Sequence, residues 1–145
     1  MPRSMTTAAF SFSHPVRVYW EDTDAGGVVF YANYLKFFER ARTEWLRALG
    51  VGQQRMHQEQ GLMLVVTDTD IRYLEPARLD DDLTITVTLA AVARATLTLA
   101  QAALRGSSVL AESRITLACV AATSFRPRRL PQSILDALAS TPKKK

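Results

Sequence analysis

The chain has 145 residues, of which 48% are hydrophobic and 22% charged, and these values predict one soluble globular domain with a core of ordinary size. No apolar run approaches the roughly 20 residues that cross a bilayer, and the N-terminus lacks the apolar stretch of a secretory signal, so we expect no stable membrane insertion. The net charge of +4 becomes nearly neutral without the three C-terminal lysines, which disfavours nucleic acid as a partner. The single cysteine, Cys119, excludes an internal disulfide, and these features together favour a cytoplasmic protein.

An arm, a strand and a polar loop are predicted at the start of the chain. Residues 1–13 lack a periodic apolar pattern and are predicted to form a flexible arm. The segment 22–27, Asp-Thr-Asp-Ala-Gly-Gly, predicts a loop or tight turn. Between them, from His14 onwards, apolar and polar residues alternate. This alternation predicts a strand with its apolar positions at Val16, Val18 and Trp20.

A long amphipathic helix is predicted after the loop, because apolar residues recur at spacings of three and four. Gly50 ends it, as expected just beyond a helix C-terminus. A short second helix is predicted over residues 53–60 and ends at Gly61. The apolar face of the long helix consists of Tyr31, Tyr34, Phe38, Ala41, Trp45 and Leu49.

The second half of the chain is predicted to be mostly strand, with one terminal helix begun by Pro131. Pro76 interrupts the first of these strands and indicates a bulge or an edge. The clearest alternation of apolar residues with threonine lies at 83–89. The predicted strands span residues 62–74, 83–89, 95–104 and 109–121.

The order of elements favours an α+β fold in which an antiparallel sheet wraps around one apolar helix. We place this single domain at residues 14–140, followed by a basic tail at 141–145. One helix leaves the edges of such a sheet uncovered, so we expect an oligomer.

Carboxylate chemistry is what remains after the common motifs are excluded. The chain has no dinucleotide-binding or phosphate-binding glycine motif and no Gly-x-Ser-x-Gly sequence. His14 and His57 lie far apart and Cys119 falls within a predicted strand, so a zinc site or Cys/His dyad is not expected. Asp22 and Asp24 directly precede the long helix, whose free N–H groups can stabilise an oxyanion. Taken alone, this pattern is somewhat more typical of aspartates that cap a turn or a helix.

A family resemblance bears on whether these aspartates are catalytic or cap a turn. The segments 16–34 and 38–44 resemble the signature of the Tol–Pal-associated acyl-CoA thioesterases, in the 4-hydroxybenzoyl-CoA thioesterase branch of the hotdog superfamily. Further similarity lies at 73–81 and 127–131, and the whole resemblance covers about residues 15–138. It implies the hotdog fold and acyl-CoA hydrolysis without a metal or other cofactor.

The resemblance also implies roles for particular residues. Asp24 matches the catalytic aspartate, as nucleophile or as general base, and the backbone N–H of Tyr31 matches the donor that polarises the thioester carbonyl. Many relatives have histidine at the Tyr31 position, so its side chain is given no role. Asp22 is interpreted as organising the loop, and Asn33 as capping or ordering the first helical turn.

Substrate contacts are implied around this loop and at three arginines. Gly26, Gly27 and Val28 are expected to lie against the substrate, since glycine allows close approach of the backbone. Arg94 aligns with a residue that meets the CoA phosphates in related enzymes. Arg128 and Arg129 are weaker candidates for the same role.

Family members form edge-to-edge dimers, often paired into homotetramers, with sites across the subunit interface, and either CoA or acyl carrier protein could be the thioester donor. A second hotdog branch uses a helical glutamate, for which Glu39 and Glu44 are candidates. We interpret both as helix charges paired with Arg42 or Arg47. The alternative functions are a hotdog dehydratase or hydratase, and a non-catalytic acyl-CoA-binding or scaffold protein of envelope or phospholipid-synthesis machinery.

Overall fold

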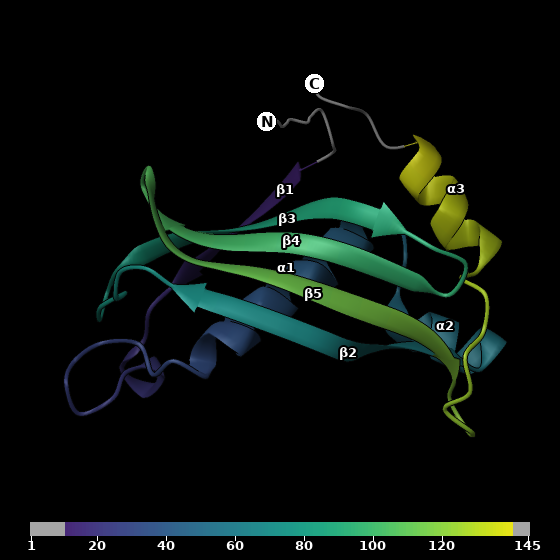
Figure 1. Ribbon diagram of the computed structural model, residues 1–145, viewed down its shortest axis with the longest axis horizontal. Coiled ribbons are helices and arrows are strands. Elements are labelled where there is room, and N and C mark those ends of the chain that lie inside the picture. Colours follow the sequence, from purple (N-terminus) through teal and green to yellow (C-terminus); the bar gives the residue numbers. More distant parts are fainter. Residues whose placement is uncertain (1–10, 141–145) are drawn as a thin grey trace.

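The computed structural model describes residues 11–140, so the predicted basic tail and most of the predicted arm lie outside the described residues. One five-stranded sheet has the order β1-β3-β4-β5-β2, and every neighbouring pair is antiparallel (Figure 1). The predicted antiparallel sheet is therefore confirmed. The strands are β1 (Ser11–Arg17), β2 (Leu62–Tyr73), β3 (Asp82–Val92), β4 (Thr96–Arg105) and β5 (Ser108–Ala121).

The long helix α1 (Asn33–Ala48) lies across one face of the sheet, as predicted (Figure 1). Its buried residues recur at spacings of three and four, which produces one apolar face toward the strands. The short helix α2 (Gln53–Gln60) packs on β2, and α3 (Gln132–Ser140) closes the described chain. The buried residues of α1 are Tyr34, Phe37, Phe38, Ala41, Arg42, Trp45 and Leu46.

Three local predictions near the N-terminus were wrong. The first strand begins at Ser11, so residues 11–13 belong to the sheet and not to an arm. The strand ends at Arg17, and Trp20 lies in a short 3-10 turn, η2 (Trp20–Asp22), with its side chain 80% exposed. Helix α1 begins at Asn33, which places Tyr31 in the preceding turn and outside the apolar face. Alternation and helical spacing do not reveal where a tight turn interrupts them.

Charged residues of α1 follow the sequence prediction only in part. Glu44 forms the predicted ion pair with Arg47, at 3.4 Å between carboxylate and guanidinium. Arg42 is instead buried against the sheet, at 8% exposure.

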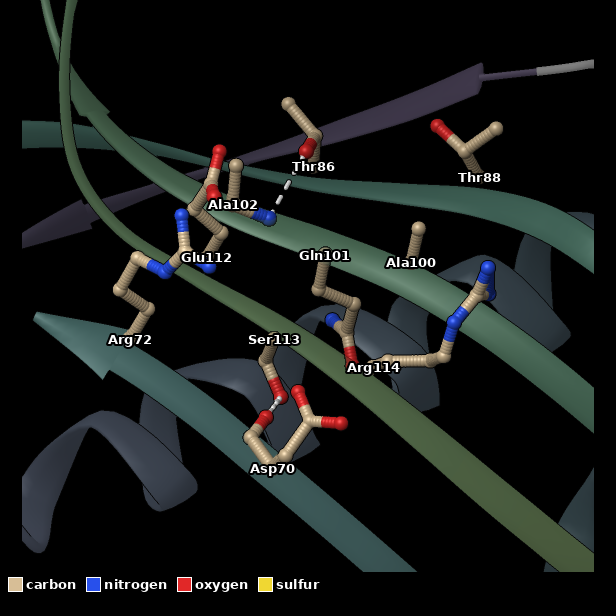
Figure 2. A pocket seen from close by; sticks show the side chains of 10 residues that line it. All are labelled: Asp70, Arg72, Thr86, Thr88, Ala100, Gln101, Ala102, Glu112, Ser113 and Arg114. Atoms are coloured by element: carbon tan, nitrogen blue, oxygen red, sulfur yellow. Dashed lines mark hydrogen bonds between the residues drawn. The ribbon is translucent and has the colours of Figure 1, made fainter.

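The outer face of the sheet, opposite α1, carries a polar hollow of about 420 Å³ (Figure 2). Asp70, Arg72, Glu112 and Arg114 project from it, and α1 lies behind the strands in this view. Within residues 11–140 no cluster of three His, Cys, Asp or Glu side chains could hold a metal ion. No helix among these residues is long and apolar enough to span a membrane.

Candidate active site

The predicted catalytic loop is a tight hairpin between η2 and α1. The amide of Asp24 donates to the carbonyl of Val28 at 2.8 Å, and the amide of Gly27 donates back to the carbonyl of Asp24 at 3.0 Å. Gly27 has φ = +80°, a conformation that disfavours any side chain. Because these bonds close the turn, Asp24, Gly26, Gly27 and Val28 lie together, as the sequence predicts.

The Asp24 carboxylate is exposed and oriented by its own turn. Its Oδ1 accepts the amide N–H of Gly26 at 2.8 Å. A Cβ atom at residue 26 would lie 3.3 Å from that oxygen, so a side chain there would crowd the carboxylate. The second oxygen, Oδ2, is therefore the one available to a substrate carbonyl or a water molecule.

Asp22 differs from Asp24 in being buried, with 6% of its surface exposed. Its Oδ2 accepts the amide of Tyr19 at 2.8 Å, and its carbonyl accepts the amide of Phe30 at 3.0 Å. The same carbonyl accepts Nδ2 of Asn33 at 2.8 Å. Asn33 is the first residue of α1, and this bond ties the helix to the loop. Of the two roles predicted for Asn33, the contact fits ordering of the first helical turn, since its side chain bonds backward to Asp22 and does not cap the helix. These contacts fit the loop-organising role predicted for Asp22.

Tyr31 presents a free backbone donor beside the start of α1. Its amide N–H makes no hydrogen bond to any residue within 11–140, whereas its carbonyl accepts the hydroxyl of Tyr73 at 3.0 Å. The residue is 64% exposed, and the positive end of the α1 dipole lies next to it. A carbonyl oxygen bound here would accept this N–H without competition from a protein acceptor within residues 11–140.

Two further tyrosines fix this region, and sequence reasoning gave neither a role in the site. The hydroxyl of Tyr34 accepts the amide of Ala77 at 3.2 Å, and the carbonyl of Ala77 accepts the amide of Val29 at 2.8 Å. The rings of Tyr34 and Tyr73 pack edge to face at 5.4 Å. Burial, then the neighbouring tyrosines, raises the pKa of Tyr73, so its hydroxyl stays protonated at neutral pH. Residues 73–81 belong to the segment quoted for the family resemblance, which was the only signal that they matter.

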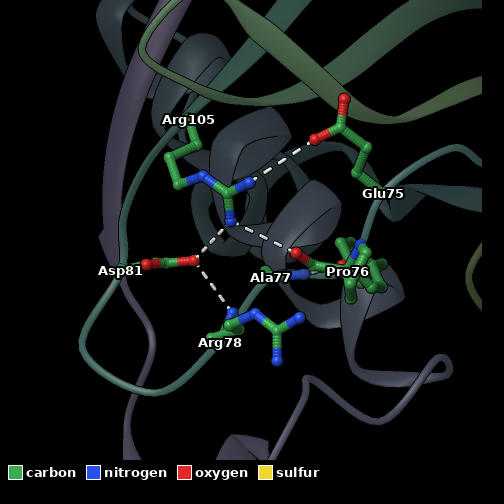
Figure 3. A network of polar contacts seen from close by, with 7 residues as sticks. Glu75, Pro76, Ala77, Arg78, Asp81 and Arg105 are labelled. Carbon is green, nitrogen blue, oxygen red and sulfur yellow. Dashed lines mark hydrogen bonds and ion pairs between the residues drawn. The ribbon is translucent and has the colours of Figure 1, made fainter.

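An ion-pair network anchors the segment that carries Ala77 (Figure 3). Arg105 binds Asp81 at 2.8 Å, the carbonyl of Pro76 at 3.2 Å and Glu75 at 3.5 Å. Burial tends to raise the pKa of Asp81, but the bonds from the Arg78 amide and from Arg105 outweigh it and lower the pKa below its ordinary value. The network therefore stabilises the site with Asp81 ionised.

This lowered pKa predicts acid sensitivity. Because the folded-state pKa lies below the unfolded value, Asp81 contributes stability above the ordinary aspartate range and loses it as the pH falls through the folded pKa. We expect the melting temperature to fall between about pH 6 and pH 3 by more in the wild type than in Asp81→Asn. Thermal unfolding at several pH values measures this difference, and equal slopes for the two proteins would contradict it.

Two apolar hollows share Tyr31 and Tyr73 in their linings. A groove of about 660 Å³ runs between α1 and β2, with Tyr31 and Tyr73 at one end, Leu35 and Val66 along it, and Arg42 within it. A smaller hollow of about 270 Å³ is lined by Val29, Tyr31, Tyr34 and Tyr73. Both are large enough to contain part of an acyl chain or an aromatic ring.

The predicted phosphate-binding arginines lie at the other end of the sheet. The hairpin that carries Asp24 is next to the start of β3, whereas Arg94 follows the end of that strand (Figure 1). An eleven-residue strand is roughly 35 Å long at about 3.3 Å per residue. The Arg94 carbonyl accepts the amide of Leu130, and the Arg128 amide donates to Cys119, so the two arginines lie near each other. One chain does not bring them to its own Asp24.

Comparison with known proteins assigns this geometry to a family. The family model described as the thioesterase-like superfamily matches residues 18–138. The chain belongs to this superfamily. The predicted resemblance is thereby confirmed, and this thioesterase is 45% identical over 123 residues to acyl-CoA thioesterase YbgC of Haemophilus influenzae, covering 85% of this chain and 90% of that protein.

Other similarities agree with that assignment. Acyl-CoA thioester hydrolase YbgC of Escherichia coli O157:H7 is 42% identical over 125 residues, which cover 86% of this chain and 92% of that protein. The crystal structure of a probable thioesterase from Bartonella henselae superposes with a TM-score of 0.80 at 35% identity, covering 83% of this chain and 99% of that chain. The hotdog fold is confirmed by these neighbours, and so is the expectation that the protein is a thioester hydrolase.

Proposed function

We propose that this thioesterase hydrolyses acyl-CoA in the cytoplasm, with Asp24 as nucleophile or general base and the Tyr31 N–H as oxyanion donor. One observation carries the proposal: an exposed carboxylate held by a glycine turn occurs together with an unpaired amide at the start of the central helix. The similar proteins of H. influenzae and E. coli are named as acyl-CoA hydrolases, which supports CoA as the thiol carrier.

The chemistry follows from these two groups. The thioester carbonyl oxygen accepts the Tyr31 N–H, which stabilises the negative charge as the carbonyl carbon becomes tetrahedral. Asp24 either forms an anhydride with the acyl group or removes a proton from the attacking water. In both routes the carbon–sulfur bond breaks, CoA leaves as the thiolate and takes up a proton, and water supplies the oxygen of the free acid. No metal or other cofactor is needed.

The complete site is proposed to form between two copies. Antiparallel pairing of two β2 edges places the Tyr73 end of one strand beside the Leu62 end of the other. Leu62 is paired with Ala121, whose amide donates to the carbonyl of Arg126, so this end adjoins the arginine-rich loop. Such a dimer, or a tetramer made from it, brings the Arg94 and Arg128 end of one copy toward the Asp24 loop of the other.

Release of free CoA thiol from a panel of acyl-CoAs tests the activity itself. We expect turnover of at least one acyl class, and acyl carrier protein thioesters in the same panel identify the natural donor. If no thioester is hydrolysed but acyl-CoA still binds, the alternative holds: a binding or scaffold protein beside envelope machinery such as Tol–Pal.

Removal of the Arg94 charge is expected to weaken binding of the CoA phosphates without affecting the chemical step. For Arg94→Ala we expect KM to rise several-fold for acyl-CoA, because Arg94 is exposed and solvent screening limits its contact with a phosphate to about 1 kcal/mol. Thioesters of the short thiol N-acetylcysteamine lack the phosphates and should be unaffected. Equal effects on both substrates would show that Arg94 does not bind the CoA phosphates.

Loss of the Tyr73 hydroxyl is expected to slow turnover. Tyr73→Phe retains the ring packing but removes the bond to the Tyr31 carbonyl, which loosens the peptide that carries the oxyanion donor. A net hydrogen bond of about 0.5–1.5 kcal/mol corresponds to a roughly 2- to 10-fold lower kcat with little change in KM. Steady-state kinetics measure the change in kcat, and a thermal melt of the same sample checks that the variant is folded. An unchanged kcat in the folded variant would contradict the prediction.

A further inference from the structure

Phe125 is an exposed aromatic residue in the turn that follows β5, at the same end of the sheet as α2 and α3 (Figure 1). Its side chain is 60% exposed and is not among the residues that pack against the hydrophobic core. Within residues 11–140 no other aromatic ring contacts it. A single exposed apolar side chain is common in proteins, so exposure alone assigns it no role.

The backbone of Phe125 is held in a conformation that phenylalanine rarely adopts. Its φ is +60°, and Asp80 is the only other non-glycine residue with a positive φ in the described part of the chain. Aspartate tolerates this region, whereas a bulky side chain is strained there. Two backbone bonds close the turn: the Phe125 amide donates to the Ala121 carbonyl at 2.8 Å, and the Ala121 amide donates to the Arg126 carbonyl at 2.9 Å. Glycine would fit this turn without strain, so the fold does not require the ring.

Four exposed arginines lie in the same loop or beside it. The amide of Leu130, directly after the loop, donates to the carbonyl of Arg94 at 2.9 Å, and Pro127 forms a bridge with Val120 of β5. The four are Arg94, Arg126, Arg128 and Arg129. None of their guanidinium groups forms an ion pair with a carboxylate among residues 11–140. Because arginine binds phosphate through paired N–H groups, these unpaired charges favour a ligand with several phosphates.

An exposed aromatic ring in a loop of unpaired arginines matches the two parts of an adenine nucleotide. The ring can stack on the flat face of the base, while guanidinium groups bind the phosphates. An anionic membrane would also attract the arginines. Phe125 is, however, the only large apolar side chain of residues 122–129, which gives a membrane little apolar surface to bury. The observations therefore favour a nucleotide, and the nucleotide within the proposed function is that of CoA.

We propose that Phe125 stacks on the adenine of CoA and thereby makes this thioesterase prefer CoA to acyl carrier protein as the thioester donor. Both donors present the acyl group on phosphopantetheine, but acyl carrier protein has no adenine nucleotide. The ring therefore strengthens binding of one donor and leaves the chemistry at Asp24 unchanged. This inference rests on the proposed hydrolysis of acyl-CoA, but the stacking itself can be measured without hydrolysis.

Binding of 3′,5′-ADP, the nucleotide part of CoA, measures the stacking alone. For Phe125→Ala we expect the Kd to rise about fivefold or more by calorimetry, the lower end of what stacking of a base on an aromatic side chain contributes. Phe125→Tyr should bind as the wild type does, whereas Phe125→Leu, which is apolar but not aromatic, should bind as weakly as Phe125→Ala. No binding by the wild type, or an equal Kd for wild type and Phe125→Ala, would overturn the proposal. A wild type that binds 3′,5′-ADP but hydrolyses no thioester would refute the hydrolase proposal and leave the stacking intact.

The preference between donors is measured with one acyl group carried on CoA and on acyl carrier protein. For Phe125→Ala we expect kcat/KM to fall about fivefold or more with acyl-CoA and to stay unchanged with the acyl carrier protein thioester. An equal loss with both donors would mean that the loop docks a protein. Unchanged kinetics together with weaker binding to anionic phospholipid vesicles would mean that it docks a membrane. Either result contradicts the proposal.

Phe125→Gly distinguishes a binding role of the ring from a structural one. Glycine adopts a positive φ without strain, so we expect an equal or higher melting temperature together with weaker binding of 3′,5′-ADP. Thermal unfolding and calorimetry on the same sample measure the two effects. A lower melting temperature with unchanged binding would show that the ring stabilises the turn and would overturn its assignment to CoA.

Discussion

Asp24→Asn is expected to lower kcat/KM for acyl-CoA by about 100-fold or more while the protein stays folded. The amide oxygen of asparagine can still accept the Gly26 N–H, so the hairpin is preserved. The negative charge is lost, however, and a neutral amide neither attacks a thioester nor accepts a proton from water. Release of CoA thiol at saturating and at limiting substrate concentrations measures the effect on kcat and on kcat/KM, respectively.

Asp82→Asn is the matched control for this change. Asp82 is an exposed aspartate at the start of β3, paired with an exposed Arg17 at 2.9 Å. Exposed ion pairs contribute little, so we expect activity and stability close to wild type. Activity that survives Asp24→Asn would contradict the assignment and direct attention to Glu39 and Glu44.

The route taken by Asp24 can be resolved in the same preparation. If Asp24 is the nucleophile, a single turnover in ¹⁸O-water can transfer label into the Asp24 carboxylate when water attacks the anhydride there. If Asp24 is only a base, all label enters the free acid. Label found by mass spectrometry in the peptide containing Asp24 therefore demonstrates the nucleophilic route, whereas an unlabelled peptide is the product both of a general base and of an anhydride attacked by water at its acyl carbon.

Phe38→Ala is expected to cost about 3–5 kcal/mol of unfolding free energy. The Phe38 side chain is fully buried on α1, in the core between the helix and the sheet. Its truncation removes apolar contacts and leaves a cavity that the surrounding strands fill only in part. Urea denaturation at fixed protein concentration gives the difference, because dimer formation would otherwise shift the midpoint.

Arg47→Ala on the same helix is the control for helix propensity. Its side chain is 66% exposed and pairs with Glu44, so a change within about 0.5 kcal/mol is expected. A loss at Phe38 no larger than at Arg47 would mean that α1 does not pack against the sheet as described.

Elements whose signals are local could be predicted from the amino-acid sequence. The three- and four-residue spacing of apolar side chains predicted α1, and the alternation around Ile85 predicted β3, because burial on one face imposes those periods. The Asp-Thr-Asp-Ala-Gly-Gly segment predicted the turn, since positive φ at Gly27 needs glycine. Family resemblance, not periodicity, assigned chemistry to Asp24.

Contacts between residues that are far apart in the sequence could not be predicted and became known from the structure. Tyr73 reaches the Tyr31 carbonyl across 42 residues, and Arg42 reaches Gln101 across 59, contacts that no local pattern encodes. The same is true of Arg94, which lies at the opposite end of β3 from the hairpin it was expected to assist. The periodicity of apolar residues indicates which face of a helix or strand is buried. Strand order and register determine which residues of other elements pack against that face.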